Sequence, residues 1–281
     1  GPVHRLDATQ RRPRLPQAPC AGNFLRLGGP KLKRSPPPAR IERLALIPNL
    51  PHPWRMTDFI FRIPAPSVEI SGRTERFAVR RIFCVGRNYA EHAREFGNDE
   101  RDPPFFFTKP ADAIVPSGAA LTYPSLTQDL HHEAELVVAI GTGGRDIAAK
   151  DAESHIFGFA CGNDLTRRDL QAVAKSQRRP WDMSKAFDES AVIGAIVPGQ
   201  SIAPEAAIRS HVDGQLRQNA KIGDMTWPIA DVIAALSTHV ALAPGDLIMT
   251  GTPAGVGPVA RGQSCRVEID GLPDAEFRYT V

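Results

Sequence analysis

The apolar residues of this chain lie in short runs that glycine, proline and polar residues interrupt. Residues 81–85 combine β-branched and aromatic side chains and stop at Gly86, and residues 133–140 form an apolar run that ends in a glycine-rich turn. Runs of this length and composition are typical of strands, and the second is apolar on both faces, which indicates burial. The same pattern predicts further strands at residues 59–61, 77–79, 105–108, 156–160, 191–197, 246–250 and 265–269.

Few segments have the pattern of a helix. Helices are predicted at residues 88–96, 148–154, 164–175 and 228–238, and Asn88 is a suitable N-cap for the first of them. Many short strands at irregular spacing, without the regular alternation of strand and helix, do not match a parallel doubly wound sheet. The sequence therefore predicts an α+β fold that is mainly β.

The basic residues are distributed unevenly. Residues 1–55 contain 11 Lys and Arg against 2 Asp and Glu, together with 11 of the 26 prolines. This composition predicts a disordered or artefactual extension, with an organellar transit peptide or a nucleic-acid-binding arm as the alternatives. The segment lacks interleaved aromatic residues, so no nucleic-acid partner is expected. Residues 56–80 are predicted to be a small strand segment and residues 81–281 the catalytic domain.

Length and composition exclude several classes of protein. The chain has 281 residues, of which 42% are hydrophobic, enough for a substantial core. No apolar run approaches the roughly 18 to 20 residues of a membrane-spanning helix, so no membrane partner is expected. The 4 cysteines are widely spaced and form no C-x-x-C pair, which argues against disulfides and structural zinc and predicts a cytoplasmic protein. The glycine-rich segments lack the spacing of a dinucleotide fingerprint or a P-loop.

Three carboxylates are the first candidates for chemistry. Glu133 and Glu135 are two residues apart at the start of a buried strand, so their side chains project from one face, and Asp164 follows another apolar strand. Buried like charges need compensation, and a divalent cation between them supplies it. Oxygen ligands favour Mg²⁺, with Mn²⁺ or Ca²⁺ as substitutes. An exposed Glu-x-Glu at a strand edge is the alternative.

Two further groups suit catalysis. His92 and Glu95 are three residues apart on the predicted first helix, so the carboxylate can orient the imidazole as a general base. A solvated pair on a helix surface is the alternative interpretation. Lys185 lies between aromatic residues, where a partly desolvated ammonium can stabilise an oxyanion. A surface lysine is the alternative there.

Six ordered motifs resemble the fumarylacetoacetate hydrolase family from Arg81 to the C-terminus. They are G-R-N-Y-A-x-H-x-x-E at Gly86 to Glu95, F-x-K-P at Phe107 to Pro110, E-x-E at Glu133 and Glu135, N-D-x-T-x-R-D-x-Q at Asn163 to Gln171, W-x-x-x-K-x-F-D at Trp181 to Asp188, and G-D-x-I-x-T-G-T-P-x-G-V-G at Gly245 to Gly257. Within the family, residues 103–112 are most similar to the bacterial fumarylpyruvate hydrolases of gentisate breakdown.

The resemblance implies a mixed-sheet β-roll, a homodimer and the hydrolysis of a 2,4-diketo acid (an acylpyruvate). It implies that Glu133, Glu135 and Asp164 hold Mg²⁺, that His92 and Glu95 position the attacking water, and that Lys185 stabilises the oxyanion. Gln171 and Thr252 are then expected to contact the keto-acid end of the substrate. The expected partners of its far carboxylate are Arg87, Lys109 or Arg168. Oxaloacetate decarboxylation and keto–enol isomerisation are alternatives on the same site.

Overall fold

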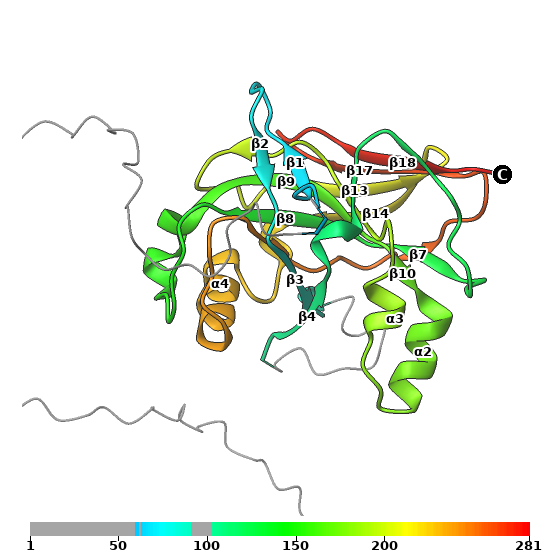
Figure 1. Ribbon diagram of the computed structural model, residues 1–281, viewed down its shortest axis with the longest axis horizontal. Helices are drawn as coiled ribbons and strands as arrows, with labels where there is room; N and C mark the ends of the chain where they lie inside the picture. The colour runs from blue at the N-terminus through cyan, green and yellow to red at the C-terminus, as the bar shows by residue number, and fades with distance from the viewer. Residues whose placement is uncertain (1–59, 62, 91–102) are drawn as a thin grey trace, which may run out of the picture. The chain divides into compact units, whose positions relative to one another are not determined.

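The computed structural model describes residues 60, 61, 63–90 and 103–281 (Figure 1). The chain divides into two units, residues 1–60 and 61–281, and the described helices and strands all belong to the second. The predicted extension at residues 1–55 lies outside the described residues, as does most of the predicted helix at 88–96. No helix among the described residues is both long enough and apolar enough to span a membrane.

A mixed sheet of eight strands is the centre of the fold. Its strands β3 and β15 are parallel, as are β11 and β5, and the other neighbours are antiparallel. In spatial order the strands are β4 (Phe105–Lys109), β3 (Arg81–Gly86), β15 (Asp246–Met249), β8 (Ala134–Ile140), β9 (Ile156–Asp164), β11 (Ala191–Ile193) and β5 (Ile114–Pro116), while β12 (Val197–Pro198) also pairs with β9.

A second sheet of five strands packs against β8 and β9 (Figure 1). It consists of β14 (Gln215–Lys221), β13 (Ala207–Val212), β17 (Ser264–Ile269), β18 (Ala275–Tyr279) and β6 (Ala119–Leu121). Leu136 and Val138 of β8 face the core with this sheet, whereas Val137 and Ala139 face a second core. Hairpin β1 (Ser67–Glu69) and β2 (Arg76–Ala78) covers that second core. Because successive side chains of a strand alternate between faces, β8 is apolar on both.

Shorter elements surround these sheets. A three-stranded sheet contains β10 (Thr166–Arg167), β7 (Leu130–His132) and β16 (Gly257–Pro258). The α-helices within the described residues are α2 (Arg168–Ser176), α3 (Asp182–Lys185) and α4 (Ile229–His239), and α4 packs against the 3₁₀ helix η3 (Ala149–His155). The same part of the chain also contains the 3₁₀ helices η2 (Ala111–Ala113) and η4 (Ile222–Asp224).

The predicted fold class is confirmed, since the described chain is mostly sheet with few helices and its sheets are mixed. Several predicted boundaries are wrong. The helix predicted from residue 164 begins at Arg168, because Asp164 ends β9 and Thr166 pairs with β7. The strand predicted at 191–197 is two short strands, and residues 60 and 61 form bends. For α2, β11 and β12, tertiary pairing rather than local propensity sets where the element begins and ends.

Candidate active site

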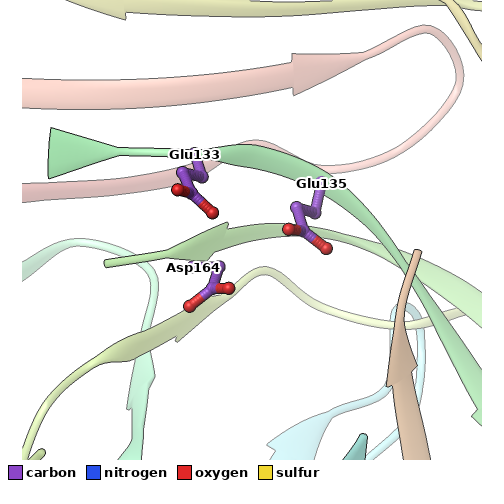
Figure 2. Close-up of side chains that lie close together, drawn as sticks. All are labelled: Glu133, Glu135 and Asp164. Atoms are coloured by element: carbon purple, nitrogen blue, oxygen red, sulfur yellow. The ribbon is translucent and has the colours of Figure 1, made fainter. Parts of the chain in front are cut away.

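The three predicted carboxylates converge where β8 begins and β9 ends (Figure 2). Glu133 precedes β8 and Glu135 lies in it, so their side chains share a face, as predicted. Antiparallel pairing brings Asp164 beside them, and its amide donates to the Glu133 carbonyl over 2.9 Å. Each of the three carboxylates offers one oxygen atom, and these three oxygens all lie within 4.8 Å of one another. All three residues are at most 5% exposed.

Two of these carboxylates already have cationic partners. Lys185 Nζ lies 2.7 Å from both Glu133 Oε2 and Asp164 Oδ2. Arg168 Nη2 lies 2.5 Å from Glu133 Oε1. Lys109 Nζ lies 2.7 Å from Asp164 Oδ1, but without hydrogen-bond geometry, so this oxygen is buried with no hydrogen bond from the part of the chain described. Three basic side chains therefore share in compensating the buried charge of Glu133 and Asp164.

Glu135 differs from the other two carboxylates. Its Oε2 accepts a hydrogen bond of 2.7 Å from the amide of Gly251, and no described Lys or Arg is paired with it. Burial raises the pKa of Glu135 well above its usual value, and the charges of Asp164 and Glu133 add to the shift. Only glycine fits at 251, because its φ is +99° and a Cβ atom would lie 2.7 Å from that of Asn88.

The donor set fits a hard divalent cation. Oxygens bound to one Mg²⁺ or Ca²⁺ ion lie at most about 4 to 5 Å apart, which matches the spacing of the three carboxylates. The Asp164 oxygen without a hydrogen bond and the buried charge of Glu135 are the two features that a cation would satisfy. The residues present therefore form a site that could hold a metal ion.

Lys185 is held in the charged form. Burial alone would lower its pKa, but the carboxylates of Asp164 and Glu133 outweigh that effect and raise it. Two of the three ammonium hydrogens are directed to Glu133 and Asp164. The third has no hydrogen-bond acceptor among the described residues and can be donated to an oxygen in the pocket, since an ammonium has three donors and no acceptor.

A pocket next to the carboxylates contains most of the predicted site residues. Its lining includes Arg87, Glu133, Glu135, Asp164, Arg168, Gln171, Lys185 and Thr252. Lys109 does not line it. This side chain is buried behind Asp164 and donates to the backbone oxygens of Leu165 and Lys185. Its position therefore differs from the predicted contact with the far carboxylate of a substrate. His92 and Glu95 lie outside the described residues.

Lys175 and Trp181 also line the pocket and were not predicted. The Lys175 ammonium lies 5.1 Å from the centre of the Trp181 ring. Burial, together with the charges of Arg168 and Arg87, lowers the pKa of Lys175 to about 8. Helical spacing was a usable signal, because Lys175 follows Gln171 by four residues in α2 and therefore lies on the same face. The face of α2 toward the pocket is basic.

Arg87 adds a further cation to the pocket lining. Its guanidinium lies 5.3 Å from the centre of the Phe105 ring, and the Phe105 and Trp181 rings are in edge contact with centroids 5.4 Å apart. The backbone of Arg87 has φ +62°, an uncommon conformation for a residue with a side chain.

Comparison with known proteins identifies the family. A family model described as fumarylacetoacetate (FAA) hydrolase C-terminal matches residues 81–280, and the chain belongs to this family. It is 44% identical over 178 residues to a fumarylpyruvate hydrolase from Ralstonia sp, covering 63% of this chain and 92% of that protein. It is 38% identical over 205 residues to a mitochondrial oxaloacetate decarboxylase from Dictyostelium discoideum, covering 72% of this chain and 94% of that protein.

A solved structure is similar over most of the chain. It is a crystal structure of fumarylpyruvate hydrolase from Pseudomonas aeruginosa in complex with Mn²⁺ and pyruvate. The identity is 49%, the TM-score is 0.77, and the match covers 80% of this chain and 100% of that one. The similarity supports the predicted fold type.

Proposed function

We propose that this protein hydrolyses the carbon–carbon bond of an acylpyruvate, with fumarylpyruvate converted to fumarate and pyruvate in a gentisate-type pathway of aromatic degradation. The observation that carries the proposal is the convergence of three buried carboxylates on a pocket that is lined by basic residues. The 44% and 49% identities to fumarylpyruvate hydrolases support the choice of substrate.

Mg²⁺ is the proposed physiological ion, with Mn²⁺ and Ca²⁺ as substitutes. Glu133, Glu135 and Asp164 would hold it, because hard cations prefer oxygen donors and these three offer one each within reach of a single ion. A bound divalent cation supplies Lewis-acid stabilisation of negative charge on the keto-acid oxygens. The Mn²⁺ and pyruvate in the related Pseudomonas structure agree with this assignment.

In the proposed reaction, side chains of this chain transfer the proton and stabilise the negative charge that develops. His92, oriented by Glu95, takes a proton from water, and the water oxygen bonds to the acyl carbon. The third hydrogen of the Lys185 ammonium stabilises the oxyanion that forms. The carbon–carbon bond then breaks, and its electron pair leaves with pyruvate, which takes up a proton. Gln171 and Thr252 bind the keto-acid end of the substrate.

The far carboxylate of the substrate is proposed to bind Arg87 and Lys175. Both line the pocket, and each is held against an aromatic ring. The chain outside residues 1–55 contains 23 Lys and Arg against 29 Asp and Glu, so its overall charge does not attract a dianion. Local cations must therefore do so. Arg168 is a weaker candidate for this contact, because it is paired with Glu133 and Gln171.

The proposed function is tested by an ultraviolet assay of diketo-acid loss, with products identified by mass spectrometry. Fumarylpyruvate, acetylpyruvate and oxaloacetate form the substrate panel, each with and without a metal chelator. We expect fumarylpyruvate to be hydrolysed with the highest kcat/KM, and chelator to stop the reaction. Turnover of fumarylpyruvate that is unaffected by complete metal removal would contradict the metal site.

Oxaloacetate decarboxylation or keto–enol isomerisation is the second candidate. The 38% identity to the Dictyostelium oxaloacetate decarboxylase favours it. Oxaloacetate carries a carboxylate where an acylpyruvate carries its acyl group, so its 2-keto-acid end could use the same carboxylates and Lys185. Release of carbon dioxide from oxaloacetate at a higher kcat/KM than any acylpyruvate hydrolysis would make it the main function.

The charge of Lys175 gives the reaction a predicted pH dependence. With a pKa of about 8, Lys175 is protonated below this value and loses its charge above it. We expect KM for fumarylpyruvate to rise as pH increases through about 8, by several-fold. In Lys175→Met, KM should be high at all pH values and this rise should be lost. Lys150→Met, in the exposed part of η3, is the control. An identical pH profile of KM in Lys175→Met would contradict the assignment.

A homodimer in the cytoplasm is the proposed state of the protein, as the family resemblance implies. Light scattering coupled to size-exclusion chromatography tests the dimer directly. A nucleic-acid-binding role for residues 1–55 is tested by salt-dependent retention on DNA of the full chain and of a chain beginning at Met56. Equal, weak retention of both would exclude that role.

A further inference from the structure

Gln218 is a buried side chain in a strand that otherwise faces solvent. It is 1% exposed, while every other residue of β14 is exposed or half-buried. The pairing of β13 and β14 shifts directly before it, since Ser210 pairs with Gln218 but His211 pairs with Leu216. Such a bulge redirects side chains. A buried amide requires hydrogen-bond partners for both its oxygen and its nitrogen.

All the partners of the Gln218 amide are defined. Its Oε1 accepts from the backbone N–H of Ala134 over 3.0 Å and contacts His132 Nδ1 at 3.1 Å. Its Nε2 donates to the carbonyl oxygen of Pro253 and to Thr252 Oγ1, each over 2.8 Å. A backbone N–H can only donate and a carbonyl oxygen can only accept. The orientation of the amide is therefore fixed by Ala134 and Pro253.

This orientation determines what the Thr252 hydroxyl can do. Because Gln218 Nε2 donates to Thr252 Oγ1, the hydroxyl hydrogen must point elsewhere. Within residues 60–61, 63–90 and 103–281, the hydroxyl donates to no protein acceptor, and Thr252 lines the pocket beside Glu135. The Thr252 hydroxyl is thus a hydrogen-bond donor in the pocket, and Gln218, which does not line the pocket, sets its direction.

Gln218 also joins two parts of the site. Ala134 lies between Glu133 and Glu135 in the chain, while Thr252 and Pro253 belong to the segment that follows β15. The side chain of Gln218 connects the backbone at the carboxylates to that segment. Resting on the acylpyruvate function proposed above, we propose that Gln218 is a positioning residue that makes Thr252 donate its hydroxyl hydrogen to an oxygen of the keto-acid ligand.

Calorimetric titration with pyruvate at saturating Mn²⁺ tests the proposal without requiring turnover. Thr252→Val removes the donor, and we expect roughly tenfold weaker pyruvate binding, the usual loss for a hydrogen bond to a charged group. Gln218→Glu still accepts from Ala134 but cannot donate, so the Thr252 hydroxyl turns toward it. We expect a similar, roughly tenfold loss. Thr252→Ser keeps the hydroxyl and should bind within about threefold of the wild type.

The double variant Gln218→Glu/Thr252→Val separates positioning from a general structural effect. If Gln218 acts through the hydroxyl, the double variant should bind pyruvate no more weakly than Thr252→Val alone. Losses that multiply would overturn the proposal, as would undiminished pyruvate binding by Thr252→Val. Gln215→Glu, an exposed change in the same strand, is the matched control and should bind normally.

Metal affinity is measured separately by titrating each variant with Mn²⁺ alone, so that an indirect effect on the carboxylates is identified. Where Gln218→Glu does not fold, Gln218→Met replaces it in the same cycle, with the same requirement that its effect vanish in the Thr252→Val background. A wild-type protein that neither binds pyruvate with Mn²⁺ nor hydrolyses an acylpyruvate would refute the proposed function itself. If the wild type binds pyruvate normally but the losses of the two single variants multiply in the double variant, only the role of Gln218 would be refuted.

Discussion

Replacing Glu135 by glutamine is expected to lower kcat/KM by roughly a thousandfold, equivalent to about 4 kcal/mol, and to remove tight Mn²⁺ binding. Glu135 is the carboxylate of the three that has no described Lys or Arg partner, so its charge is the one left for a metal ion. Glutamine has nearly the same shape, and its oxygen can still accept the hydrogen bond from Gly251. The loss therefore reports the charge rather than the packing.

The measurements for Glu135→Gln are steady-state kinetics on fumarylpyruvate and calorimetric titration with Mn²⁺. Glu276→Gln, an exposed position in β18, is the control and should behave like the wild type. The companion variant His92→Ala is expected to keep Mn²⁺ binding and to lose kcat by roughly 10² to 10⁴. Tight Mn²⁺ binding by Glu135→Gln would contradict the metal site, and full hydrolysis by His92→Ala would contradict water activation.

Replacing Lys185 by methionine is expected to lower kcat by roughly 10² to 10³ and the free energy of unfolding by about 3 to 5 kcal/mol. The loss of kcat follows from removal of the donor proposed to stabilise the oxyanion. The loss of stability follows because Lys185 is 2% exposed and contacts both Glu133 and Asp164, so its removal takes one cationic partner from each of two buried carboxylates. Methionine has a volume similar to that of lysine, so the variant reports the loss of the positive charge rather than a change in packing.

Metal binding distinguishes the two roles of Lys185. Because its ammonium occupies oxygens of Glu133 and Asp164, Lys185→Met should bind Mn²⁺ at least as tightly as the wild type, and added Mn²⁺ should restore part of the lost stability. Urea unfolding with and without Mn²⁺ measures this, with Lys150→Met as the control. Undiminished kcat in a folded, metal-bound Lys185→Met protein would refute the oxyanion role.

Several parts of the site were predictable because they depend on local sequence. The apolar run of β8 predicts a buried strand, and the two-residue period of a strand places Glu133 and Glu135 on one face whatever the rest of the fold does. Asp164 was a candidate because it follows another apolar strand, although no local pattern connects it to β8, and the motif resemblance implies the same ligand. Lys175 was not predicted, although it follows Gln171 by about one helical turn in α2 and this spacing places both on one face.

The charge balance of the site was not predictable in this way. Lys109, Arg168 and Lys185 come from three separate segments. The pairing of β4 with β3, the pairing of β8 with β9, and the placement of α2 and α3 bring them to the carboxylates. From the sequence, Lys109 was indistinguishable from a substrate contact, whereas the folded chain buries it behind Asp164.

Strand character, the shared face of Glu133 and Glu135 and the choice of a hard cation were accessible from the chain alone, because periodicity and ligand chemistry are local properties. The tertiary structure decided the rest. It set which basic side chain pairs with which carboxylate, where α2 begins, and the hydrogen bond between Gln218 and Thr252. Those contacts join residues far apart in sequence, and their free energies depend on burial and on the bulge between β13 and β14, neither of which a local pattern encodes.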